Sequence, residues 1–103
     1  MRACLILTTC SKKTEAHKIA KALLTEKLAA CIQISSKIRS LYDWKGRHES
    51  ASEYQLWIKC TQLKSIKCMK RIEELHSYEV PEILMMKVDT ASKKYLRWLQ
   101  SAC

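Results

Sequence analysis

The stretch LYDWKGRHESASEYQLWIKCT, residues 41–61, decides the fold, because it has the pattern of two strands joined by a tight turn. Lys45-Gly46 marks the turn, and Gly46, the only glycine of the chain, is free to take the positive φ that such a turn favours. From about residue 52 to residue 61 the side chains alternate between two faces. The apolar face comprises Tyr54, Leu56, Ile58 and Cys60, and the other face comprises Glu53, Gln55, Trp57 and Lys59.

The segment before the turn extends this hairpin toward the N-terminus. Alternation with a period of two begins at Leu28, and the strand resumes after Ser35-Ser36 and reaches Trp44. The two strands exceed the usual length of about five or six residues, so we expect the hairpin tip to project beyond a compact domain. Exposed strand edges need covering, and a neighbouring subunit could provide the cover.

The remaining elements follow from periodicity on either side of the hairpin. Short apolar runs predict a strand buried on both faces over residues 3–9 and a buried strand over residues 83–88. Helical spacing predicts amphipathic helices over 13–27 and 63–76, and a final helix that ends near residue 102. Two right-handed strand–helix–strand crossovers then predict an α+β fold, a ferredoxin-like split β-α-β sandwich with an extra C-terminal helix.

Length and charge limit the class of protein. A chain of 103 residues indicates one domain with a thin core, which oligomerisation would enlarge. The net charge of +9 favours acidic partners such as nucleic acid, although lysines spread along the chain also keep a protein soluble. Four basic residues gather on the outer side of helix 63–76: Lys64, Lys67, Lys70 and Arg71.

The six cysteines favour a reducing compartment. The segment of residues 1–7 is too short for a signal peptide, and no Cys-x-x-Cys pattern indicates a zinc ribbon or a thioredoxin site. We therefore expect reduced thiols in the cytoplasm, most of them packed as small hydrophobic side chains. No apolar run approaches ~20 residues, so no membrane partner is expected.

The loop of residues 75–82, LHSYEVPE, holds the most suggestive chemistry. It combines a histidine, a tyrosine, two carboxylates and the only proline. His76 is the leading candidate metal ligand, since a neutral imidazole suits copper and zinc; alternatively, it interacts with the carbonyls at a helix end. Cys10 and Cys31 offer soft sulfur donors for Cu(I), with core packing as the alternative for each.

Four segments together resemble the CutA divalent-cation-tolerance family. They are residues 28–31, residues 42–46, residues 53–59 and residues 75–82, and the terminal residues 95–99 are similar to the closing helix of that family. The resemblance covers nearly the whole chain and implies a single CutA-like domain over residues 1–103. It also implies a homotrimer whose long hairpins pair between subunits, and a role in tolerance of copper and other divalent cations.

The implied trimer is similar to that of the PII signalling proteins, whose subunits enclose clefts for small ligands. Six residues are candidates for such a cleft, with trimer packing and interface ion pairs as the alternative: Trp44, Glu53, Lys59, Tyr78, Glu79 and Glu82. Three positions depart from the family pattern. Ser77 replaces a usual proline, residues 47–53 are less acidic than usual, and Thr8 stands where some members carry a metal-binding cysteine.

Two other functions agree with part of the sequence and disagree with another part. The charge and the β-α-β-β-α-β order are compatible with a basic nucleic-acid-binding module, but the first strand lacks the aromatic residues that stack on bases. An acylphosphatase shares the topology, but its site uses an asparagine and this chain contains none. We therefore expect a protein that is not an enzyme, binds a metal ion or small ligand, and requires no cofactor for folding.

Overall fold

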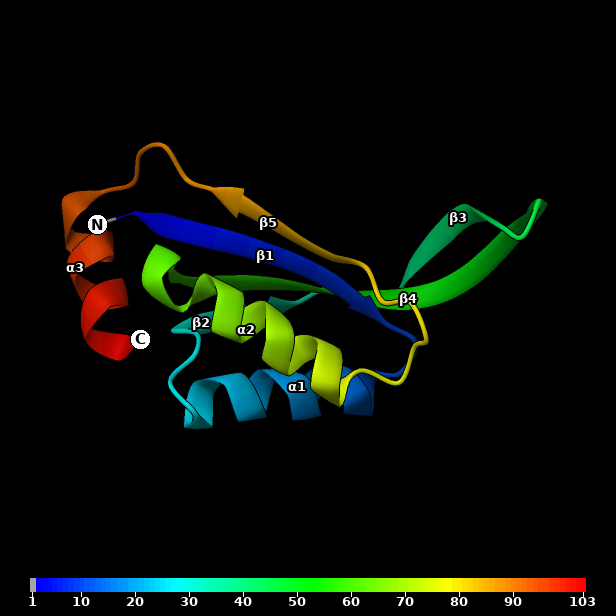
Figure 1. Ribbon diagram of the computed structural model, residues 1–103, viewed down its shortest axis with the longest axis horizontal. Coiled ribbons are helices and arrows are strands. Elements are labelled where there is room, and N and C mark those ends of the chain that lie inside the picture. The colour runs from blue at the N-terminus through cyan, green and yellow to red at the C-terminus, as the bar shows by residue number, and fades with distance from the viewer. Residues whose placement is uncertain (1) are drawn as a thin grey trace.

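The long hairpin is the dominant feature of the computed structural model, which describes residues 2–103. Strands β3 (Ile38–Trp44) and β4 (Arg47–Thr61) pair antiparallel from Ile38↔Glu53 to Trp44↔Arg47 (Figure 1). Lys45 and Gly46 form the turn with φ values of 53° and 78°. Two successive positive φ angles are what a two-residue turn of type I′ requires, so the predicted turn is confirmed.

Strand β4 connects the hairpin to the main sheet. Its second half pairs with β1 (Ala3–Cys10) and β2 (Cys31–Ile34), and β1 also pairs with β5 (Ile83–Lys87), which gives the antiparallel order β2-β4-β1-β5. β4 begins five residues earlier than predicted, since its pairing with β3 continues to the turn. The segment before the turn is divided into β2 and β3 at Ser35, which bonds to the backbone of Gln55.

Helices α1 (Lys13–Thr25) and α2 (Gln62–Leu75) cover one face of this sheet. Their buried side chains pack on the alternating inward residues of β1 and β4, in a core that includes Ile6, Ile58, Ile19, Leu23 and Ile72. Helix α3 (Lys93–Ala102) lies at the end of the molecule opposite the hairpin. The ferredoxin-like α+β prediction, with its extra C-terminal helix, is confirmed.

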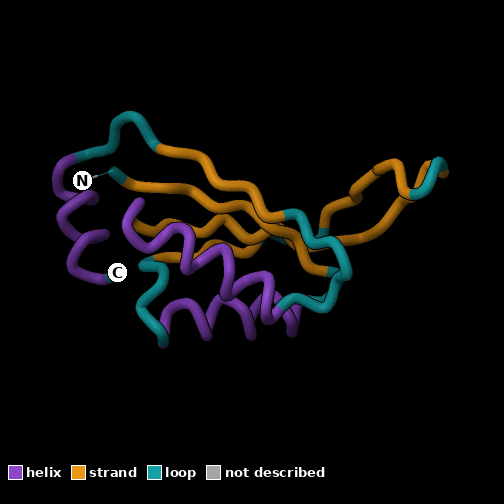
Figure 2. Tube along the Cα trace, in the orientation of Figure 1, coloured by secondary structure: helices purple, strands orange, loops and turns teal. Residues whose placement is uncertain are grey.

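The hairpin gives the molecule an elongated shape. Its strands continue well past the helices (Figure 2), and the dimensions of the molecule are 44 × 26 × 23 Å. The hairpin therefore projects as the strand lengths predicted. Within residues 2–103, no helix is long and apolar enough to cross a membrane.

The second face of the sheet is largely uncovered in the single chain. Leu5, Leu7 and Trp57 share this face with Leu84 and Met86, and we call these five residues the open sheet face. Leu84 is 54% exposed and Met86 is 45% exposed. The predicted burial is therefore incomplete in the isolated chain, because α1 and α2 both pack on the other face. Leu5 and Leu7 of strand 3–9 are half-buried, and Leu84 and Met86 of strand 83–88 are exposed.

Candidate ligand pocket and metal-ligating cluster

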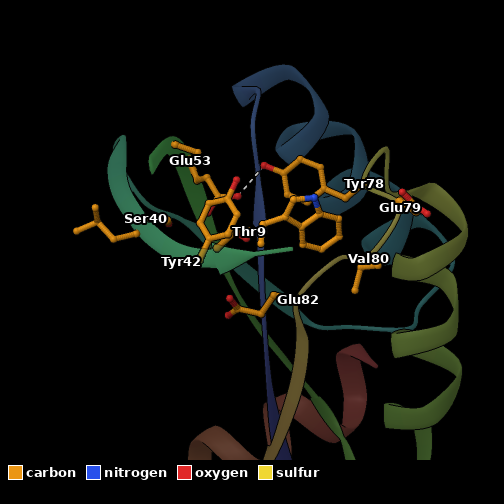
Figure 3. A pocket seen from close by; sticks show the side chains of 11 residues that line it. Thr9, Ser40, Tyr42, Glu53, Tyr78, Glu79, Val80 and Glu82 are labelled. Atoms are coloured by element: carbon orange, nitrogen blue, oxygen red, sulfur yellow. Dashed lines mark hydrogen bonds between the residues drawn. The ribbon is translucent and has the colours of Figure 1, made fainter. Parts of the chain in front are cut away.

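A pocket of about 740 Å³ lies at the root of the hairpin. The hairpin contributes Ser40, Tyr42, Trp44 and Glu53, while the loop after α2 contributes Tyr78, Glu79, Val80 and Glu82. Tyr42 and Tyr78 point into the same space from these two segments (Figure 3). The loop keeps this position because His76, at the end of α2, anchors it to β1. Aromatic rings and carboxylates thus line one concave site, as is typical of small-ligand pockets.

Tyr78 and Glu53 form the fixed wall of this pocket. The Tyr78 hydroxyl donates a hydrogen bond of 2.6 Å to Oε2 of Glu53, whose side chain is buried on β4. Desolvation raises the pKa of Tyr78, and the hydrogen bond to the Glu53 carboxylate raises it further. Tyr78 is therefore a neutral donor at physiological pH, and it holds Glu53 in place. The Trp44 ring lies 5.7 Å from Nζ of Lys45, which places a cation over the ring.

The pocket contains every predicted cleft residue except Lys59. Lys59 belongs to the part of β4 inside the main sheet, where its ammonium group donates a hydrogen bond to Gln33. Thr9 also lines the pocket, although sequence reasoning missed it. Thr9 and Glu53 follow the same strand alternation as Leu7 and Trp57, so the pocket lies on the same side of the sheet as the open sheet face.

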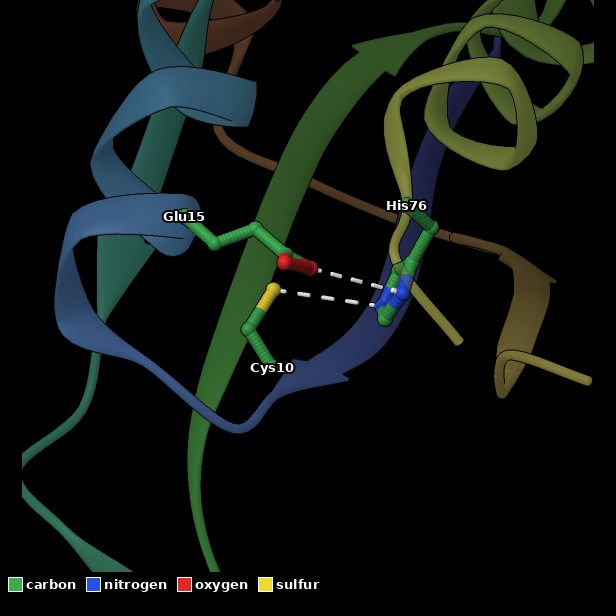
Figure 4. A group of neighbouring side chains, drawn as sticks. All are labelled: Cys10, Glu15 and His76. Carbon is green, nitrogen blue, oxygen red and sulfur yellow. Dashed lines mark hydrogen bonds and ion pairs between the residues drawn. The ribbon is translucent and has the colours of Figure 1, made fainter. Parts of the chain in front are cut away.

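A second group of side chains lies behind the pocket. Cys10 ends β1, Glu15 lies in the first turn of α1, and His76 caps the end of α2. Their side chains point toward one another (Figure 4), and their candidate ligand atoms all lie within 4.8 Å. Sγ of Cys10 is 3.9 Å from Nε2 of His76, and Oε1 of Glu15 is 3.5 Å from Nδ1 of His76. Nitrogen, sulfur and oxygen donors in one cluster fit zinc or copper.

Hydrogen bonds already occupy both ring nitrogens of His76. Nε2 lies 2.7 Å from the carbonyl oxygen of Thr9, which can only accept, so Nε2 carries the proton. The Tyr78 amide donates to Nδ1 over 3.2 Å. Burial raises the pKa of the Cys10 thiol to about 12, and the charge of nearby Glu15 adds to the effect. An incoming metal ion must therefore displace the thiol proton and at least one hydrogen bond.

The structure brings together two of the three predicted metal ligands. Cys31 lies on β2 opposite Lys59, on the other face of the sheet from Cys10. Glu15 takes the third position of the cluster, and sequence reasoning missed it. The available signal was weak: Glu15 precedes Ala16 at the margin of the buried face of α1, and its side chain is only 15% exposed.

Tyr78 links the cluster to the pocket. Its backbone amide bonds to His76, its hydroxyl bonds to Glu53, and its ring centroid lies 4.8 Å from that of His76. A change in the ligands of Nδ1 therefore acts directly on a residue of the pocket wall. Fold and site together define a class: a ferredoxin-like protein with a projecting hairpin and a ligand pocket beside an uncovered sheet face.

Comparison with known proteins identifies the family within this class. The family model described as CutA1 divalent ion tolerance protein matches residues 4–102. The chain belongs to this family, whose members are divalent-cation tolerance proteins.

Individual relatives agree with this assignment. The chain is similar to the divalent-cation tolerance protein CutA of Thermus thermophilus, with 37% identity over 92% of each chain. It is 35% identical over 88% of its length to a CutA homolog of Xenopus laevis and 34% identical over 94% to a chloroplastic CutA of Arabidopsis thaliana. It spans only 60% and 53% of the length of these two relatives.

Solved structures agree with the observed fold. Structural similarity to CutA from Xylella fastidiosa gives a TM-score of 0.94 at 32% identity, covering 97% of this chain and 96% of that one. The corresponding TM-score for CutA1 from Oryza sativa is 0.95 at 28% identity, covering 99% of this chain and 94% of that one.

Proposed function

We propose that this chain acts in tolerance of, or response to, divalent metal ions such as copper. It does so as a cytoplasmic homotrimer that binds the ion or a small ligand in clefts between subunits, without catalysing a reaction. The observation that carries this proposal is the pocket beside the open sheet face, which brings Trp44, Glu53, Tyr78, Glu79 and Glu82 together. Membership in a divalent ion tolerance family supports it.

The open sheet face supports the oligomer. Five large apolar side chains share one face, and the hairpin edges project beyond the domain. An isolated chain of this size gains little from its own core, so covering this surface with other subunits stabilises it. The pocket lies on the same side, and a neighbour packed there would close it. The proposed number of three subunits is based on the resemblance of the sequence to the CutA family.

The cluster of Cys10, Glu15 and His76 is the proposed metal-binding part of this site. When bound, the ion would take Sγ, a carboxylate oxygen and a ring nitrogen as ligands. Binding at Nδ1 of His76 would release the Tyr78 amide, so metal binding would alter the Tyr78 wall of the pocket. All six cysteines are free thiols, which supports a reducing compartment such as the cytoplasm.

Calorimetric titration with Zn(II) and Cu(II) tests the metal ligands. Cys10→Ala and His76→Gln each remove one proposed donor, and Glu15→Gln removes the carboxylate charge; each should weaken binding at least about 10-fold, as the loss of metal-site groups commonly does. Cys31→Ala removes a thiol outside the cluster and should leave the affinity unchanged. Unchanged affinity in all three cluster variants would exclude the cluster, and a loss with Cys31→Ala would restore Cys31 as a ligand.

A further inference from the structure

Helices α1 and α2, with the residues at their ends, concentrate the positive charge of the chain. Residues 12–27 and 62–75 contain nine of the 19 basic residues but only four of the ten acidic ones. The two helices lie side by side on the outside of the sheet (Figure 1), and Nζ of Lys64 reaches the carbonyl oxygen of Lys27 at 3.0 Å. The charge therefore gathers on the helix layer, on the opposite side of the sheet from the open sheet face.

Helical spacing places the free lysines on one outward surface. On α2, Ile66 and Lys67 lie three and four residues after Leu63, and Lys70 lies four and three residues after them, so all four share one side of the helix, and all are exposed. Ser65, Cys68 and Ile72 form the opposite, buried face. On α1, exposed Lys18 and Lys21 likewise lie opposite the buried residues. We call Lys18, Lys21, Leu63, Ile66, Lys67 and Lys70 the lysine face.

The acidic residues of these helices leave the lysine face unneutralised. Glu26 and Glu74 both pair with Arg71, and Glu15 turns inward toward His76. Glu73 is the one acidic residue of the two helices left without such a partner in the described chain. Among residues 2–103, none of the four lysines of the face forms an ion pair. A basic surface that is not internally compensated attracts anionic partners.

Two aliphatic side chains stand among these lysines without a packing partner. Leu63 is 80% exposed and Ile66 is 68% exposed. A helix that lies on a membrane surface typically combines lysines with exposed aliphatic residues. The lysines contact the lipid headgroups, and the aliphatic side chains reach the boundary between headgroups and acyl chains. Nucleic acid fits this surface less well, because it offers no aromatic ring for base stacking and would bury two aliphatic groups against phosphates.

We propose that the lysine face docks the protein onto an anionic phospholipid surface. The lysines contact the headgroup phosphates and carboxylates, and Leu63 and Ile66 insert between the headgroups. This role goes beyond metal tolerance and does not depend on the pocket. The sequence expectation of no membrane partner was based on the lack of a spanning segment; a surface that lies on a membrane needs none.

Sedimentation of the full-length protein with vesicles tests this docking. The protein should bind vesicles of phosphatidylcholine with 30% phosphatidylserine and should not bind pure phosphatidylcholine vesicles. Lys67→Gln/Lys70→Gln should weaken binding roughly 30-fold, since each lysine near such a surface contributes about 1 kcal/mol. Leu63→Gln should also weaken binding, and the remaining binding should be lost at a lower salt concentration than in the unmodified protein.

The matched control removes the same charge elsewhere. Lys93→Gln/Lys94→Gln alters two exposed lysines of α3 and should leave vesicle binding almost unchanged. An equal loss of vesicle binding in this control would overturn the proposal, because it would show that binding depends only on the net charge of the protein. No effect of Leu63→Gln, together with tighter binding to a 20-nucleotide RNA that needs Lys67 and Lys70, would overturn it in favour of a nucleic acid. Metal titration of the Lys67→Gln/Lys70→Gln variant should be unchanged.

Discussion

At the scale of single residues, His76 has a structural role that precedes any metal chemistry. Its ring joins the end of β1, through the Thr9 carbonyl, to the loop after α2, through the Tyr78 amide. The same ring nitrogens would serve a metal ion, so the two roles compete for one lone pair at Nδ1. If His76 lost these hydrogen bonds, Tyr78 would no longer be held in position at the wall of the pocket.

The structural role predicts a loss of stability in His76→Ala. The variant leaves a buried carbonyl and a partly buried amide without partners, so we expect a loss of roughly 1–3 kcal/mol in the free energy of unfolding. Urea denaturation of the metal-free protein measures it. His48→Ala, at an exposed position of the hairpin, should stay within about 0.5 kcal/mol. His76→Gln should lose less than His76→Ala, because an amide can both donate and accept; equal losses would contradict this role.

The buried Cys10 thiol predicts that stability falls at alkaline pH. Its pKa is raised from 9.0 to about 12 in the folded chain, so the folded state holds the proton more tightly. This contribution is fully present below pH 9 and is lost as the pH rises toward 12. Urea denaturation between these pH values should show a shallower decline in Cys10→Ala than in the unmodified protein, with Cys31→Ala as the control for loss of one thiol. If stability declined with pH equally in Cys10→Ala and in the unmodified protein, the raised pKa of Cys10 would be disproved.

At the scale of elements, the hairpin turn determines how far the molecule extends. Lys45 and Gly46 both have positive φ, but only glycine adopts it without steric cost. A Cβ at position 46 would meet no atom within 4 Å, so any penalty there comes from the backbone alone.

The two turn positions therefore predict different effects on stability. Gly46→Ala should lower the free energy of unfolding by about 1 kcal/mol, because alanine is strained at this φ. Lys45→Gly should leave the free energy of unfolding unchanged or raise it by a few tenths of a kcal/mol. Glycine removes the strain at position 45 but loses more conformational entropy on folding. Thermal unfolding of the two variants side by side measures the contrast. A stabilised Gly46→Ala protein would show that the turn has another conformation.

At the scale of the whole molecule, the open sheet face predicts dependence on subunit association. Leu84→Glu places a charge on this face and should convert an assembly of three times 12.0 kDa into single chains. Light scattering at micromolar concentration measures the mass. Ile66→Glu introduces the same charge at an exposed site on α2 and should leave the mass unchanged. A single-chain mass for the unmodified protein would contradict the trimer.

Local patterns were sufficient to predict most of the secondary structure. The alternation around Leu56 and Ile58 identified the inward face of β4, and Gly46 identified the turn, because both signals depend on neighbours in sequence. The division into β2 and β3 was less clear, since it depends on hydrogen bonds between Ser35 and the distant Gln55. The exposure of Leu84 could not be predicted either, because an apolar strand has the same pattern whether a helix or another subunit covers it.

The sequence by itself determined the elements, their order, the projecting hairpin and the family to which the chain belongs. Only the tertiary structure decided which side chains meet. It placed Glu15, rather than Cys31, beside Cys10 and His76, and it placed Lys59 outside the pocket. The physical reason is that helix and strand periodicities act over a few residues, whereas His76 meets Cys10 across a separation of 66 residues. Such contacts depend on how α1 and α2 pack on the sheet.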